Sequence, residues 1–213
     1  MNAVNDISQI AVPNSSRGRE RLARILEAAT ELFLRDGYGA TSIDSILERS
    51  GGSKATLYSY FPAKDDLFRA VVDEVVSNDA QPQLDASRDI RTALREFAAQ
   101  RLESVFSEQH RALMRLVIAE RERFPDLAKM YYERGPRLSR RLLFDYFSTL
   151  KRQNLLDIAT PEEAAEFFMG MVLHEWYIEI LLLGAAVPPS EEIRKRAERC
   201  VAYFLSTFRS TGR

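Results

Sequence analysis

The sequence predicts an all-α protein of about nine helices. Apolar residues recur every three or four positions through most of the 213 residues, which is the period of an amphipathic helix. No segment alternates apolar and polar residues as a half-buried strand does, and Gly, Pro, Ser and Thr separate the periodic segments. We expect a flexible arm at 1–18, an N-terminal helical domain at 19–79 and a C-terminal helical domain at 80–213.

Composition and charge exclude several classes of protein. A hydrophobic fraction of 46% with 29% charged residues is typical of a globular chain. The net charge of −1 excludes a bulk polycation, so any contact with nucleic acid must come from locally placed basic residues. The single cysteine, Cys200, excludes an intrachain disulfide. Residues 1–16 lack the basic segment followed by an apolar segment that is typical of a secretion signal. No apolar run is long enough to span a bilayer, and we therefore expect a cytoplasmic protein.

The N-terminal domain begins with three predicted helices. Apolar residues at helical spacing predict the first helix over 19–35, and Gly37 after it can take a left-handed conformation. Thr41 with Asp44 resembles a capping box for a short helix at 43–49. Gly51-Gly52 breaks that helix, and Ser53 can cap the next, at 54–60, which ends before Pro62. Two short capped helices around a glycine turn predict a helix-turn-helix over 42–61.

Six further helices follow. Pairs of apolar residues four apart predict a helix from 64 to about 78, joining the two domains, and similar stripes predict helices at 90–106 and from 113 to about 124. Residues 126–152 are expected to be one helix with a kink at Gly135-Pro136. Pro161 opens a helix to 183 that is apolar on more than one face, and the last helix spans 190–208.

The segment from Gly37 to Phe68, GYGATSIDSILERSGGSKATLYSYFPAKDDLF, resembles the DNA-binding domain of TetR-family transcriptional regulators. The resemblance rests on several elements in the expected order: Gly-Tyr after the first helix, a Thr-Ser pair, a turn ending in Ser-Lys, the Leu-Tyr-x-Tyr-Phe run and a Lys that begins the next helix. Gly52 departs from the pattern, because the family commonly has an aliphatic residue there. The turn is therefore expected to be looser.

A helix of seven or eight residues at 54–60 fits the major groove of DNA. Leu57 and Phe61 are its expected inward anchors. The side chains expected to face bases or sugar-phosphate are Ala55, Thr56, Ser59 and Tyr60. The resemblance implies further contacts, to phosphate, from Thr41, Ser42, Lys54, Tyr58 and Lys64, and Ser53 completes the predicted DNA-binding set. Thr41 and Ser53 as simple caps, and Tyr58 as a core residue, are the alternative interpretations.

The resemblance also implies that the C-terminal helices enclose a ligand cavity and that the last two helices, at 161–183 and 190–208, pair with a second copy. We therefore expect a homodimeric, ligand-responsive repressor on a palindromic operator in double-stranded DNA, with a small-molecule effector. Polar or aromatic residues within apolar helices are candidates for the cavity, although satisfied core groups would show the same pattern. These candidates are Arg115, Tyr131, Phe147, His174 and Tyr177.

Two other functions are consistent with parts of the sequence. A regulator with the same DNA-binding domain could be ligand-independent, or an activator. An enzyme would need a cluster of nucleophile, base or metal ligands, whereas His110 and His174 are the only histidines and no His, Cys or carboxylate spacing is typical of a metal site. We therefore expect no catalytic residues, no metal and no cofactor.

Overall fold

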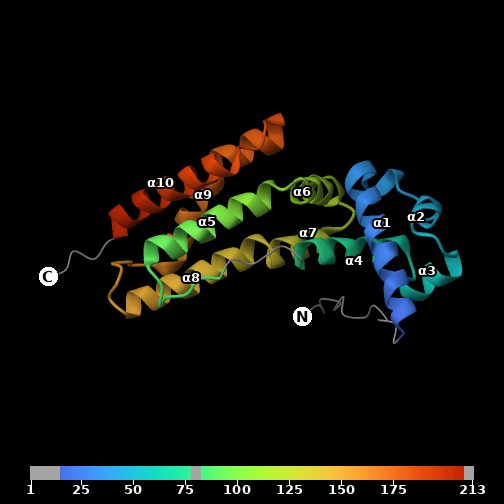
Figure 1. Ribbon diagram of the computed structural model, residues 1–213, viewed down its shortest axis with the longest axis horizontal. Helices are drawn as coiled ribbons and strands as arrows, with labels where there is room; N and C mark the ends of the chain where they lie inside the picture. Colours follow the sequence, from blue (N-terminus) through green and yellow to red (C-terminus); the bar gives the residue numbers. More distant parts are fainter. Residues whose placement is uncertain (1–14, 78–82, 209–213) are drawn as a thin grey trace. The chain divides into compact units, whose positions relative to one another are not determined.

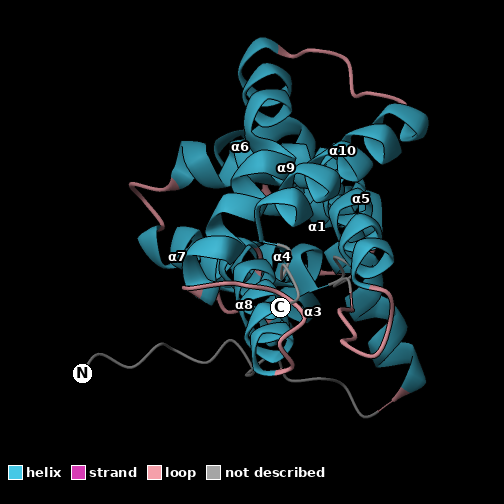
Figure 2. Cartoon of the chain, turned by 90° about the vertical axis from the view of Figure 1, so that its left-hand side faces the viewer, coloured by secondary structure: helices cyan, strands magenta, loops and turns pink. Residues whose placement is uncertain are grey.

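The computed structural model describes residues 15–77 and 83–208, and within these ranges every regular element is a helix (Figures 1 and 2). The all-α prediction is confirmed. Residues 1–14 of the predicted arm, and residues 78 and 79 of the predicted first domain, lie outside the described ranges. The helices are α1 (Ser16–Ala40), α2 (Ile43–Ser50), α3 (Lys54–Tyr60), α4 (Lys64–Ser77), α5 (Ile90–Phe106), α6 (Glu108–Glu120), α7 (Pro125–Arg134), α8 (Pro136–Arg152), α9 (Pro161–Leu183) and α10 (Ser190–Phe208).

Three of the predicted helices differ from their sequence-based bounds. The helix expected from 113 to about 124 is α6, which begins at Glu108 and ends at Glu120. α1 begins three residues earlier than expected because the Ser15 side chain accepts a hydrogen bond from the amide of Gly18 at 3.1 Å and caps the helix. α1 also continues to Ala40, past the expected end at 35, but it is broken at Gly37, where the φ of 83° and the ψ of 170° are not helical. The expected kinked helix is two helices, α7 and α8, because Gly135 leaves helical geometry and Pro136 starts the next helix.

The described chain divides into two compact units, and the first draws its residues from 1–78 and 112–131. Here α1 packs against α2 and α4, and α2 packs against α3. Most of α6 and most of α7 belong to this unit, and Leu113, Leu116, Phe124 and Leu127 are buried in one core with α1–α4. A segment that the sequence placed in the C-terminal half is thus part of the N-terminal core.

The second unit draws its residues from 79–111 and 132–213. α5 packs along α10 and α8 packs along α9, with α9 also against α5 and α10 (Figure 1). Aromatic rings fill the middle of this core: Phe147 stacks on Phe204 with centroids 4.9 Å apart, and Phe168 meets Phe204 edge-on at 5.1 Å. No helix in the described ranges is long and apolar enough to cross a lipid bilayer.

Candidate nucleic-acid interface

The α2–turn–α3 motif is built from two capped helices, as expected, but one cap differs from the prediction. Ser42 caps α2: its hydroxyl accepts from the amide of Ser45 at 3.0 Å, and the Ser45 hydroxyl accepts from the amide of Ser42 at 3.1 Å. The predicted box of Thr41 with Asp44 is wrong. Thr41 is buried, and its hydroxyl donates to the carbonyl of Gly37 at 2.8 Å, so it fastens the turn before α2.

The turn and the inward anchors of α3 are as predicted. Gly51 and Gly52 both have positive φ, 71° and 116°, which glycine adopts without a steric cost. Ser53 caps α3 by accepting from the amide of Thr56 at 3.2 Å. Leu57 is fully buried and Phe61 is 1% exposed, so one face of α3 is held against the core of the first unit. The opposite face of this short helix is fixed in place as a consequence.

The outer face of α3 carries most of the predicted DNA-binding residues. Ser53, Lys54, Ala55, Tyr58 and Ser59 are exposed, as is Ser42 at the start of α2. The core role considered for the Tyr58 side chain does not fit its 45% exposure. Thr56 and Tyr60 are half-buried, and the Tyr60 ring packs edge-on against Phe61 with centroids 6.5 Å apart.

Lys54 is not free on this face. Its ammonium lies 2.8 Å and 3.1 Å from the two carboxylate oxygens of Asp44, which the first turn of α2 presents. This hydrogen bond and the charge of Asp44 raise the pKa of Lys54, so the ammonium stays protonated. The sequence analysis missed Asp44 as part of the site, because ten residues separate it from Lys54 and only the glycine turn brings the two together.

Lys64, at the start of α4, turns toward the preceding segment of the same unit. Its ammonium donates to the carbonyl oxygen of Tyr38 at 2.5 Å and lies 4.1 Å from the centroid of the Tyr38 ring. Partial burial lowers the pKa of Lys64, and the nearby guanidinium of Arg123 lowers it further. The Tyr38 hydroxyl donates to Asp65, and burial together with this bond raises the pKa of Tyr38 to about 12. Tyr38 is a second residue of the site that the sequence analysis missed.

The five candidates for a ligand cavity are divided between the two units. Arg115 and Tyr131 lie in the first unit, on α6 and α7, whereas Phe147, His174 and Tyr177 lie in the second. Phe147 is a core residue within an aromatic stack. Arg115 is exposed, and the side chain of His174 is 79% exposed beside Glu175. The sequence pattern could not separate an exposed polar residue from one that lines an interior space.

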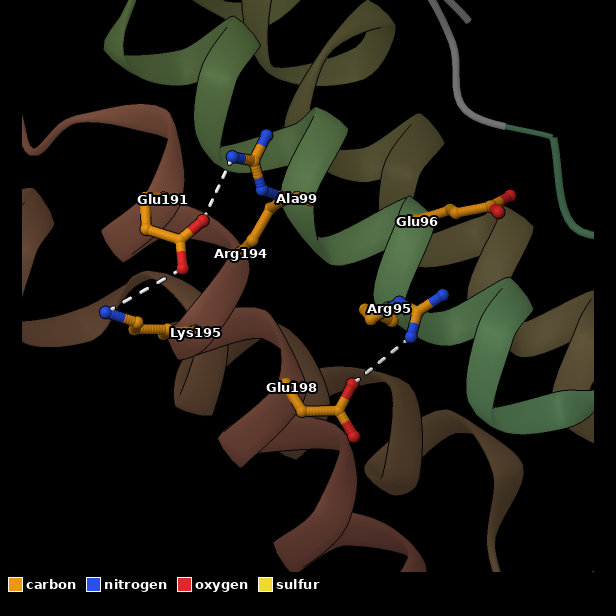
Figure 3. A pocket seen from close by; sticks show the side chains of 7 residues that line it. All are labelled: Arg95, Glu96, Ala99, Glu191, Arg194, Lys195 and Glu198. Carbon is orange, nitrogen blue, oxygen red and sulfur yellow. Dashed lines mark hydrogen bonds and ion pairs between the residues drawn. The ribbon is translucent and has the colours of Figure 1, made fainter.

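A hollow lies between α5 and α10 in the second unit (Figure 3). Its charged side chains form ion pairs with one another: Arg194 and Lys195 lie 3.1 and 3.7 Å from Glu191, and Arg95 lies 3.6 Å from Glu198. Ligand cavities are lined mainly by hydrophobic and aromatic residues, whereas six of the seven residues that line this hollow are charged. Among the residues that the structure describes, no group of three or more His, Cys, Asp or Glu side chains is placed to hold a metal ion.

Comparisons with known proteins agree with the geometry of α1–α4. Residues 25–71 match the family model of bacterial regulatory proteins of the tetR family, and residues 92–210 match that of the C-terminal domain of AefR-like transcriptional repressors. The HTH-type transcriptional regulator YvkB of Bacillus subtilis (strain 168) is 27% identical over 182 residues, which cover 85% of this chain and 94% of YvkB.

Two solved structures have the same fold over nearly the whole chain. The flavonoid-responsive regulator FrrA is 32% identical with a TM-score of 0.77, and the match covers 92% of this chain and all of FrrA. A protein of Mesorhizobium loti MAFF303099 described as a TetR-family transcriptional regulator is 26% identical with a TM-score of 0.78, over the same shares of the two chains.

Proposed function

Since the chain belongs to the tetR family of bacterial regulatory proteins and is a DNA-binding transcriptional regulator, we propose that it is a ligand-responsive repressor that binds a palindromic operator as a homodimer. The family is one of transcription regulators and not of enzymes. The observation that carries the DNA-binding part is the outer face of α3, which two caps and two buried anchors hold in place.

In this proposal α3 enters the major groove. Ala55, Thr56, Ser59 and Tyr60 meet base edges and sugars, because they lie on or beside the exposed face of α3. The contacts to phosphate come from the hydroxyl groups and ammonium groups at the helix starts and from the exposed phenol of α3, where they set the register on the duplex. These residues are Ser42, Ser53, Lys54, Tyr58 and Lys64. Thr41 supports the site from inside, through its bond to Gly37.

Exposed apolar side chains on the last two helices support the homodimer. Phe167 is 62% exposed, Leu182 76% and Leu183 74% on α9, and Tyr203 is 68% exposed on α10. Large apolar groups in such numbers are unusual on a monomer, and a second copy of the same face would bury them. Two α3 helices related by a twofold axis then read half-sites about 34 Å apart. The regulator acts in the cytoplasm, where its operator lies.

The assembly is tested by sedimentation of Leu182→Glu beside the wild type. We expect a dimer for the wild type and a shift toward monomer for the variant, with operator affinity lost in parallel. A matched substitution on an exposed polar position of the same helix, Glu166→Gln, should leave the dimer intact. A wild-type monomer that still binds the full palindrome tightly would contradict the proposed assembly.

The match of residues 92–210 to AefR-like repressors supports repression, and the similarity to FrrA, a flavonoid-responsive regulator, supports an effector. Effector binding in the C-terminal unit would weaken DNA binding, and by reciprocity DNA would weaken effector binding to the same degree. A small-molecule library that includes flavonoids, screened for a shift in operator affinity, tests this. No shift across the library would favour a ligand-independent regulator, and transcription that falls on deletion of the gene would favour an activator.

The operator itself is found by genome-wide mapping of bound sites, followed by binding measurements on the recovered sequence. We expect Lys64→Ala to weaken binding to all DNA sequences and to flatten its salt dependence, whereas Thr56→Ala should mainly change the preference between sequences. If neither substitution changes the affinity for the operator, the proposed docking of α3 and α4 is wrong.

A further inference from the structure

The turn between α6 and α7 is packed into the unit that carries the DNA-binding helices. Phe124, the last residue of this turn, is 3% exposed. Its ring meets Tyr38 edge-on with centroids 4.9 Å apart and meets Phe68 at 5.4 Å, and Phe33 completes the cluster at 5.1 Å from Phe68. Edge-on aromatic pairs contribute beyond the area that they bury. The turn is thereby joined to α1 and α4.

Two polar contacts hold the same turn. The guanidinium carbon of Arg123 lies 4.6 Å from the centroid of the Tyr38 ring and 5.1 Å from that of Phe124. Asp126, in the first turn of α7, accepts from Arg69 of α4 at 2.8 and 2.9 Å. Tyr38 therefore contacts Phe124 in a T-shaped ring pair, contacts Arg123 through its ring and donates its hydroxyl to Asp65.

Tyr38 in turn determines where the ammonium of Lys64 lies. The carbonyl oxygen of Tyr38 accepts one N–H of the ammonium, and the ring attracts the charge from 4.1 Å. An ammonium has three donors, so this arrangement leaves two for an outside acceptor such as a phosphate oxygen. Holding a lysine side chain in one geometry costs conformational entropy. Because Tyr38 already holds Lys64 in the free protein, less of this entropy is lost when DNA binds.

We propose that Phe124 and Arg123 are positioning residues for DNA binding, which fix Tyr38 so that Tyr38 holds Lys64 ready to bind a phosphate of the operator. The proposal rests on the proposed function, in which Lys64 contacts phosphate. It assigns a part in DNA affinity to a turn that lies in the C-terminal half of the sequence and itself touches no DNA.

The test is a double-mutant cycle between the turn and Lys64, read by operator affinity and its salt dependence. Phe124→Leu keeps an apolar side chain and removes the ring, and Arg123→Ala changes an exposed residue and so keeps the fold. Each phosphate contact adds about 0.9 to the slope of log affinity against log salt. Loss of one contact in each subunit of the dimer should therefore lower the slope by about 1.8 and make the fall in affinity between 50 and 200 mM salt about 12-fold smaller.

We expect Phe124→Leu and Arg123→Ala to lower both operator affinity and the salt slope, toward the values of Lys64→Ala. Either change combined with Lys64→Ala should bind no more weakly than Lys64→Ala alone, because the same contact is already lost. Arg123→Lys keeps a cation beside the ring and should restore the slope. Leu127→Ala leaves a cavity in the same core but removes no aromatic ring. It should lower thermal stability and leave the salt slope unchanged.

Additive losses of affinity would overturn the proposal, as would a wild-type salt slope in Phe124→Leu and Arg123→Ala. Coupling of Leu127→Ala to Lys64 would also overturn it, since the effect would then be general loosening of the core. If Phe124→Leu does not fold, Arg123→Ala and Arg123→Lys decide the result. A wild-type chain that does not distinguish the operator from unrelated DNA would instead refute the proposed function.

Discussion

The ion pair between Lys54 and Asp44 competes with DNA for a predicted phosphate ligand, and its removal should strengthen operator binding. The ammonium of Lys54 lies 2.8 Å from one oxygen of Asp44, and both side chains are more than half exposed. For Lys54 to bind phosphate, this pair must separate. Asp44→Asn removes the competing charge while keeping the shape of the side chain, so the ammonium is released in the free protein.

The expected gain is modest because the pair is exposed. Exposed ion pairs contribute little in water and are screened by salt. Removal of this pair should therefore lower the dissociation constant of the operator complex by about two- to fivefold. Longer-range repulsion between Asp44 and phosphates adds little at physiological salt, where the screening length is about 8 Å. The gain should therefore shrink as salt increases. Each of the two subunits of a dimer would contribute this gain in operator affinity once.

The assay is fluorescence anisotropy on the labelled operator at 50 and 200 mM salt. Glu48→Gln serves as the control, because it removes the same charge from the same helix and leaves the Lys54–Asp44 pair in place. In a Lys54→Ala background, Asp44→Asn should give no gain. Weaker binding by Asp44→Asn, or a full gain that persists without Lys54, would refute the idea that the two groups compete.

Three further outcomes follow from the structure. Tyr146→Phe should raise the free energy of unfolding in urea by about 1 kcal/mol, because the buried Tyr146 hydroxyl has no hydrogen-bond partner among the described residues. A loss of stability would show that the hydroxyl is hydrogen-bonded. Gly37→Ala should lower the free energy of unfolding by about 1–3 kcal/mol in the same assay, since a φ of 83° with a ψ of 170° is essentially restricted to glycine. No atom lies within 4 Å of an added Cβ, so the cost comes from the backbone conformation alone. An unchanged stability would mean that the turn relaxes freely. The pKa of Tyr38 is raised from 10.0 to about 12, so the stability that its protonated form contributes should be complete below pH 10 and lost as the pH rises toward 12. Tyr38→Phe should remove this part of the alkaline decline in a urea titration at pH 8 to 11, and an identical decline in both proteins would contradict it.

The α-helical content and the DNA-binding motif could be predicted from the sequence because both depend on neighbours along the chain. The bounds of α9 and α10 follow from the spacing of their apolar residues, from Pro161 at the start of α9 and from Pro188-Pro189 before α10. Ser53, Leu57 and Phe61 have the roles expected of a cap and two anchors, since capping and amphipathic burial act within one or two turns of a helix.

The choice between adjacent residues was harder to make from the sequence. Thr41 and Ser42 can both cap a helix, and the direction in which the chain leaves Gly37 decided that Thr41 turns inward and Ser42 caps α2. In the same way, the sequence does not show whether an isolated polar residue in an apolar helix faces solvent or the interior. His174 proved exposed, whereas Phe147 proved to be core.

By itself the sequence determined the α-helical content, the Ser53 cap of α3 and the membership of a DNA-binding family, because these are properties of short segments. The tertiary structure alone decided that Asp44 holds Lys54, that Tyr38 holds Lys64 and that Phe124 joins the N-terminal core. Each of these contacts joins residues far apart in the chain. Such contacts form only when the packing of whole helices outweighs the entropy of closing the chain between them, and no local pattern records that balance.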